Sequence, residues 1–173
     1  MAPDLDHAVI IALGSNLQGR FDSRQLLLEA ALERLSSAGL TIRARSSWWR
    51  SAAWPDARQP YYLNGVALVE TSLPPRSTMA FLIGLEASFG RIRAAPNAPR
   101  TLDLDLIAHG RQLIDAPGLA LPHPRAPQRG FVMGPLAEIA PLWRHPLTGG
   151  TARELAVRAL IGADACPQPI SGT

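Results

Sequence analysis

The amino-acid sequence predicts an α+β fold: a ferredoxin-like antiparallel sheet with flanking helices and a C-terminal extension. The first observation is the order of strand-like and helix-like segments, β-α-β-β-α-β, which is the order of that fold. The second is size and composition, because 173 residues, 47% hydrophobic and 18% charged, suit one domain with a full core. The third is that no internal repeat divides the chain. We therefore expect a single domain over residues 1–173, with residues 1–6 and 162–173 flexible.

The first half of the chain supplies three strands and one helix. Residues 8–13 form a continuous apolar run that ends in a Gly-Ser-Asn turn, which predicts a buried central strand. Leucines and alanines at helical spacing predict a helix over 22–38. Alternating residues predict strands over 40–49 and 61–71, and the prolines and polar residues of 50–60 predict a loop between them.

The second half continues the pattern and adds the extension. Two prolines start a helix that runs to about residue 89, and a proline-rich loop follows over 91–99. Strict alternation predicts a strand over 100–108. Beyond a stretch rich in Gly and Pro, helical patterns at 130–139 and 152–161 predict two helices in the extension.

Composition excludes several classes of protein. No apolar run approaches the roughly 20 residues that a membrane helix needs, and the N-terminus lacks a signal-like pattern, so we expect a cytoplasmic protein. The single cysteine, Cys166, cannot form an internal disulfide. All seventeen positive side chains are Arg, which excludes a Walker A lysine and a Schiff-base lysine. A net charge of +3 suits a small anionic substrate and does not demand nucleic acid.

The strand at 100–108 carries the clearest chemical signal. Its leucines fall on one face, and Asp103 and Asp105 fall together on the other, roughly 7 Å apart at Cα. Two carboxylates held side by side repel each other unless a positive charge lies between them. Mg²⁺ is the usual partner of such oxygen ligands, and Arg100 adds a fixed positive charge suited to polyphosphate. The alternative is a solvated strand face beside an arginine partner.

Other stretches add groups that suit a phosphate and a flat ring. Arg91, Arg93 and Arg100 bracket the proline-rich loop and can hold phosphates with paired hydrogen bonds, although a solvated arginine-rich loop is the alternative. Tyr62 and Asn64 fall on one strand face, where they can stack on and hydrogen-bond a heterocycle. The alternative for this pair is an ordinary core tyrosine beside a satisfied amide. The segment 122–131 brings a histidine, two arginines and a phenylalanine.

Taken together, these motifs resemble the 6-hydroxymethyl-7,8-dihydropterin pyrophosphokinase family of folate biosynthesis. The resemblance extends from residue 8 to about residue 146, in the order and spacing of the family. Its most specific block is Pro99–Asp105. The remaining matches are Ala12–Asn16, Tyr62–Asn64, Glu86, Gly90–Arg93, Pro122-His123 and Arg129–Phe131.

The resemblance implies transfer of a whole pyrophosphoryl group from MgATP to the pterin hydroxymethyl oxygen, which leaves AMP. By resemblance, Asp103 and Asp105 hold two Mg²⁺ ions, and Arg91 and Arg100 act with them in catalysis. The resemblance assigns the other residues to the two substrates: ATP to Glu86, Arg93, the backbone of Leu106, His123 and Arg129, and the pterin to Tyr62, Asn64 and Phe131. We expect the protein to bind these two small molecules and neither nucleic acid nor a membrane. We also expect it to be a monomer.

The sequence also departs from the family pattern. In the family, the loop before Pro99 often carries a tryptophan and usually closes over the substrates. Here Asn97 stands near the place of that tryptophan, and the loop looks one residue shorter, so the sequence does not predict whether this loop acts as a lid. The sequence also does not predict which residues contact the adenine, because it departs from the family pattern at Ile83, Gly118, Ala120 and Pro124. Two other functions remain as alternatives, a ferredoxin-like nucleic-acid-binding domain and a metal-dependent phosphohydrolase using the same carboxylates. The paired aspartates argue against the first, and pterin-independent AMP production would indicate the second.

Overall fold

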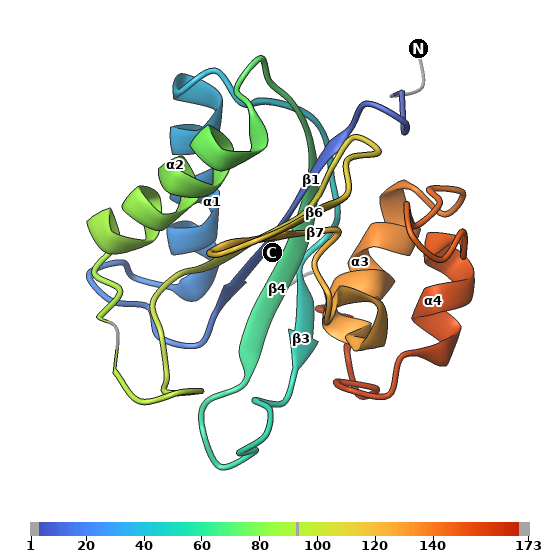
Figure 1. The fold of residues 1–173 in the computed structure, drawn as a ribbon. Coiled ribbons are helices and arrows are strands. Elements are labelled where there is room, and N and C mark those ends of the chain that lie inside the picture. Colours follow the sequence, from blue (N-terminus) through green and yellow to red (C-terminus); the bar gives the residue numbers. More distant parts are fainter. Residues whose placement is uncertain (1–3, 93, 170–173) are drawn as a thin grey trace.

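The protein contains an antiparallel sheet that organises the whole chain (Figure 1). Its structure is a computed structural model that describes residues 4–92 and 94–169. The central strand β1 (Val9–Ser15) is buried along its whole length and pairs with β4 (Tyr62–Glu70) on one side and β5 (Asp103–His109) on the other. This central position explains the apolar run in the sequence, because a strand that is paired on both sides and covered on both faces is surrounded by apolar side chains.

Helices cover both faces of the sheet. The helices α1 (Arg24–Ser37) and α2 (Pro75–Ser88) lie on one face, and α3 (Gly130–Ile139) and α4 (Ala152–Arg158) lie on the other (Figure 1). Successive residues of β1 enter separate cores: Val9, Ile11 and Leu13 join the first, and Ile10 and Ala12 join the second. The strand order and the two flanking helices confirm the ferredoxin-like prediction, and the extension supplies the second helical layer.

The strand predicted over 40–49 is divided in two. β2 (Thr41–Arg45) and β3 (Trp49–Ser51) pair with different parts of β4, and Ser46 Oγ accepts from Val66 N at 3.0 Å between them. The predicted loop at 50–60 therefore begins two residues late, because β3 continues to Ser51. The break between β2 and β3 lies next to two tryptophans that pack against different elements. Trp48 packs over Gly65 of β4, and Trp49 packs over Gly134 of α3.

The C-terminal half contains elements that the sequence did not predict. The Gly- and Pro-rich stretch folds into a hairpin of β6 (Ile114–Ala116) and β7 (Leu119–Leu121), followed by a short 3₁₀ helix, η1 (Ala126–Gln128). The last helix ends at Arg158 instead of residue 161. The terminus that the sequence predicts to be flexible contains β8 (Cys166–Pro167), which pairs with β3, while residues 170–173 lie outside the described part. Within the described residues, none of the helices combines the length and apolar character needed to span a bilayer.

Candidate active site

One cleft brings together several of the polar residues singled out in the sequence, while Arg91, Glu86 and His123 lie outside its lining. It lies beside β1, β3, β4 and β5, the loops that follow β3 and α2, and the segment from η1 into α3, and it is partly open to solvent. The long β3–β4 loop and the α2–β5 loop lie at the same end of the sheet (Figure 1). Elements distant in sequence thus supply one site.

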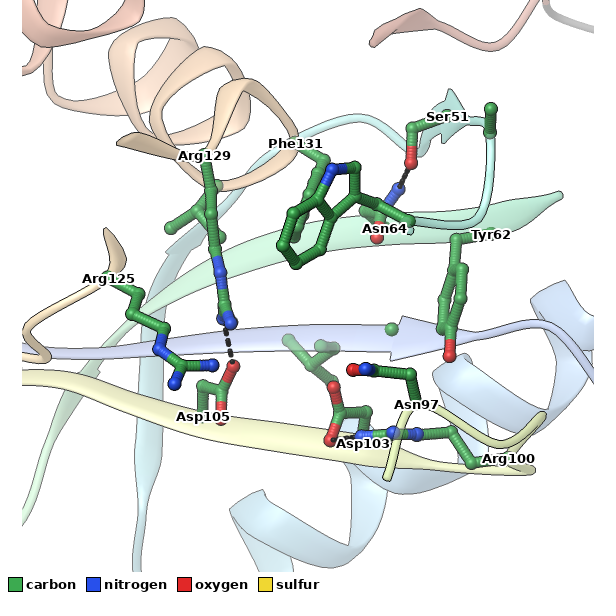
Figure 2. Close-up of a pocket in the computed structure, with 16 residues that line it drawn as sticks. Ser51, Tyr62, Asn64, Asn97, Arg100, Asp103, Asp105, Arg125, Arg129 and Phe131 are labelled. Atoms are coloured by element: carbon green, nitrogen blue, oxygen red, sulfur yellow. Dashed lines mark hydrogen bonds and ion pairs between the residues drawn. The ribbon is translucent and has the colours of Figure 1, made fainter. Parts of the chain in front are cut away.

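The strand β5 places its two carboxylates in this cleft. Leu102, Leu104 and Leu106 are buried in the core, so alternation turns Asp103 and Asp105 outward, as the sequence predicted. The residues paired with them on β1 are small: Gly14 stands opposite Asp103, and Ala12 stands opposite Asp105. Small neighbours leave the floor of the cleft open beside the carboxylates (Figure 2).

Positive side chains surround both carboxylates. Arg91 and Arg100 each donate from Nη1 to Asp103 Oδ1, at 2.9 and 3.2 Å. Arg129 donates to Asp105 Oδ2 at 3.2 Å (Figure 2). The pairs are only partly exposed, with 17–29% of each side chain accessible to solvent, so their charges are weakly screened. Guanidiniums held here are available to phosphate oxygens.

The electrostatics around Asp105 favour an added cation. Burial raises the pKa of the Asp105 carboxyl, and the neighbouring charge of Asp103 raises it further. His123 Nε2 lies 3.9 Å from Asp105 Oδ1, but burial lowers the pKa of that imidazole and keeps it neutral. A hard divalent cation next to the two carboxylates would offset both the burial and the mutual repulsion. The donor set therefore fits Mg²⁺.

Two carboxylates alone make an incomplete metal site. Over residues 4–92 and 94–169, no group of three or more His, Cys, Asp or Glu side chains is placed to hold a metal ion. Mg²⁺ ordinarily takes one or two carboxylates and completes its shell with waters and substrate phosphates. This arrangement suits a metal that enters together with a nucleotide.

Glu86 lies behind the carboxylates, on α2. Only 4% of the residue is exposed, and its Oε1 accepts from Leu104 N at 2.7 Å and from Arg91 Nη1. Burial raises the pKa of this carboxyl to about 6, against the opposing effects of the Leu104 N–H and Arg91. Glu86 thus holds the Arg91 side chain in place and joins α2 to β5. The sequence did not predict this role.

An aromatic pocket forms another part of the cleft. Tyr62 and Asn64 come from β4, and Phe131 comes from the start of α3, so three predicted residues meet here (Figure 2). Asn64 is buried and donates from Nδ2 to Ser51 Oγ at 2.9 Å. That bond leaves Asn64 Oδ1 as an acceptor beside the two rings. The arrangement suits a flat heterocycle with hydrogen-bonding edges.

Sequence reasoning missed several residues that line the cleft. Trp54 and Ala52 belong to the loop after β3, and neither carried a sequence signal of its own. Arg125, one of the two arginines noted in the segment 122–131, also lines the cleft. Among the predicted residues, Arg93 lies outside the described part of the chain. Leu106 is fully buried and does not line the cleft.

Comparison with known proteins shows that this ferredoxin-like chain is an ATP-dependent diphosphotransferase. The model of the 7,8-dihydro-6-hydroxymethylpterin-pyrophosphokinase (HPPK) family matches residues 10–141, and the chain belongs to this family. Two relatives share the name 2-amino-4-hydroxy-6-hydroxymethyldihydropteridine pyrophosphokinase. The one from Synechocystis sp. is 40% identical over 154 residues, 88% of this chain and 76% of the relative. The one from Pseudomonas aeruginosa is 41% identical over 138 residues, 80% of this chain and 83% of the relative.

A solved structure shares the architecture at low sequence identity. Wild-type HPPK-DHPS from Plasmodium falciparum superposes with a TM-score of 0.67 and 13% identity, over 87% of this chain and 44% of that chain. At such identity the likeness shows the fold alone. This chain spans less than half of the Plasmodium chain, so the comparison concerns only part of that larger protein.

Proposed function

We propose that this cleft transfers the pyrophosphoryl group of ATP, as one unit, to the hydroxymethyl oxygen of 6-hydroxymethyl-7,8-dihydropterin, releasing AMP. Membership of the HPPK family supports this reaction, with ATP as the co-substrate and folate biosynthesis as its setting. The observation that carries the assignment is the position of Asp103 and Asp105. They lie side by side in a cleft that also contains Tyr62, Asn64 and Phe131.

The carboxylates of β5 are the proposed metal ligands. Asp103 and Asp105 would hold Mg²⁺, and we assign two ions to the pair. Mg²⁺ held by these carboxylates would supply positive charge that neutralises the phosphates and favours deprotonation of the hydroxyl group. The hydrogen bonds of Asp103 and Asp105 to Arg91, Arg100 and Arg129 keep both carboxylates oriented toward the cleft.

The arginines and the histidine are the proposed phosphate-binding groups. Arg91, Arg100 and Arg129 approach the carboxylates closely enough to donate to phosphate oxygens bound next to them. His123 is neutral because burial lowers its pKa, so it can donate one N–H to the nucleotide phosphates. Glu86 contributes by holding Arg91 in place. In such transfers, positioning and electrostatic stabilisation supply most of the rate.

The aromatic pocket is the proposed pterin site. Tyr62 and Phe131 provide two rings for stacking, and Asn64 provides a carbonyl oxygen for the ring edge. Burial raises the pKa of the Tyr62 phenol, so the ring stays neutral and stacks without a charge. For an open-faced nucleic-acid binder the geometry is less suitable, because helices pack on both faces of this sheet. We also propose that the protein works as a monomer.

The test is AMP release from MgATP, with and without 6-hydroxymethyl-7,8-dihydropterin, for the wild type and Asp105→Asn. We expect pterin-dependent AMP release by the wild type and a loss of at least about 100-fold in Asp105→Asn, because a metal ligand is removed. Asp115→Asn is the matched control, since this exposed aspartate lies on the β6–β7 hairpin, outside the cleft. AMP release that ignores the pterin would indicate a phosphohydrolase, and an active Asp105→Asn would exclude the metal assignment.

A further inference from the structure

The chain beyond α4 crosses the molecule and contacts two parts of the aromatic pocket. This tail, residues 159–168, lies outside residues 10–141, which the family model matches. It first runs alongside the start of α3. Ile161 N donates to Gln128 O at 2.9 Å, and Gly130 N donates to Ile161 O at 2.7 Å, one residue before Phe131.

Gly162 carries the first contact, against Phe131. Its φ is +67°, and a Cβ at this position would lie 2.4 Å from Phe131 Cδ1. Only glycine permits both the left-handed backbone and this close approach. The tail backbone therefore packs directly on the ring of Phe131 and limits where that ring can lie.

Asp164 carries the second contact, against the loop that follows β3. Its Oδ2 accepts from Ala52 N at 2.6 Å. Two residues later β8 pairs with β3, and Gln168 N donates to Trp48 O at 2.7 Å, so backbone pairing holds the tail on this edge. Ala52 and Ser51 both line the cleft, and Ser51 Oγ accepts the hydrogen bond that orients Asn64.

We propose that Asp164 is a positioning residue for the pterin, acting through the Ser51–Ala52 segment, with Gly162 acting likewise through Phe131. This inference rests on the proposed function of the cleft. The two contacts meet the pocket from different elements: Gly162 supports a stacking ring, and Asp164 fixes the point where the loop leaves β3. The carboxylates of β5 make no contact with either residue among the hydrogen bonds and ion pairs of the described chain, so the effect should fall on the pterin and spare MgATP.

The test compares Asp164→Ala, Asp164→Asn and the tail control Cys166→Ser by steady-state kinetics with each substrate varied. Cys166 is exposed and free, and its replacement leaves both tail contacts intact. We expect Asp164→Ala to raise KM for the pterin about three- to tenfold, the effect of one lost hydrogen bond. KM for ATP should change less than about twofold, because binding at the phosphate side is untouched. Asp164→Asn should restore most of the pterin affinity, since its Oδ1 can still accept from Ala52 N.

Several results would overturn the inference. An equal rise in both KM values, an unchanged pterin KM, or an Asp164→Asn variant as impaired as Asp164→Ala would each show that this hydrogen bond does not position the pterin. A lower Tm in Asp164→Ala with unchanged pterin KM would give the tail a purely structural role and contradict the proposal. A separate result would contradict the proposed function of the cleft: a wild-type protein that releases no AMP in response to the pterin.

Discussion

The buried carboxylate of Glu86 offers the sharpest test of the electrostatics, through the variant Glu86→Gln. Both hydrogen bonds of this side chain use Oε1, which accepts from Leu104 N and Arg91 Nη1. A glutamine can keep both with its own Oε1, so the substitution removes the charge and the titration while retaining shape and partners. The variant therefore isolates the free energy associated with ionising this one group.

The magnitude follows from the pKa of Glu86, which burial raises from 4.5 to about 6. A carboxyl with a raised pKa binds its proton more tightly in the folded state than in the unfolded chain. Its contribution to stability is complete below pH 4.5 and is lost as pH rises through 6. Raising the pKa from 4.5 to about 6 corresponds to about 2 kcal/mol. The wild type should lose about 2 kcal/mol of unfolding free energy relative to Glu86→Gln between pH 4 and pH 7.

The assay is urea unfolding of both proteins at several pH values, with EDTA present so that no metal binds the neighbouring aspartates. Taking the difference between the two proteins cancels the titration of groups that they share. Glu33→Gln is the matched control, because it makes the same substitution at an exposed helix residue outside the cleft. A constant difference for Glu86→Gln, or a wild type that gains stability toward pH 7, would refute the reasoning.

Two further predictions concern packing and capping, measured as free energies of urea unfolding. Gly134→Ala should destabilise the protein by about 1–2 kcal/mol, since the new Cβ would lie 2.6 Å from Trp49 Cζ3. Gly84→Ala, in a helix with no atom near the added methyl, should stabilise it by about 0.5–1 kcal/mol, and equal effects of the two would contradict this account. Thr151→Ala should cost about 1 kcal/mol because it removes the capping box with Glu154; an unchanged stability would mean that the cap contributes nothing.

The features that the sequence predicted well are those that short-range periodicity determines. Alternation over 102–106 correctly turned Asp103 and Asp105 away from the core, because a strand repeats every two residues whatever surrounds it. The continuous apolar run of β1 correctly predicted a buried central strand, because every residue of such a strand lies in the core. Tyr62 and Asn64 followed from this rule as well, as they share one face of β4 and both line the cleft.

The features that the sequence did not predict depend on contacts between distant segments. β8 exists because Cys166 and Pro167 meet β3, and nothing in a proline-containing tail indicates that pairing. The break between β2 and β3 depends on Ser46 Oγ, which takes the hydrogen bond of Val66 N. Trp54 reaches the cleft from a loop whose path is set by tertiary structure, so no local pattern could identify it.

The backbone conformation of Asn97 bears on the short loop between α2 and β5. This residue has a φ of +61°, the left-handed conformation that asparagine tolerates better than most residues other than glycine. A left-handed residue lets a short loop reverse direction, which fits a loop that looks one residue shorter than in the family. The carbonyl of Asn97 accepts from Gln59 Nε2 at 2.9 Å, so the α2–β5 loop is joined to the β3–β4 loop across the mouth of the cleft. Asn97 therefore forms a turn that holds the two loops together.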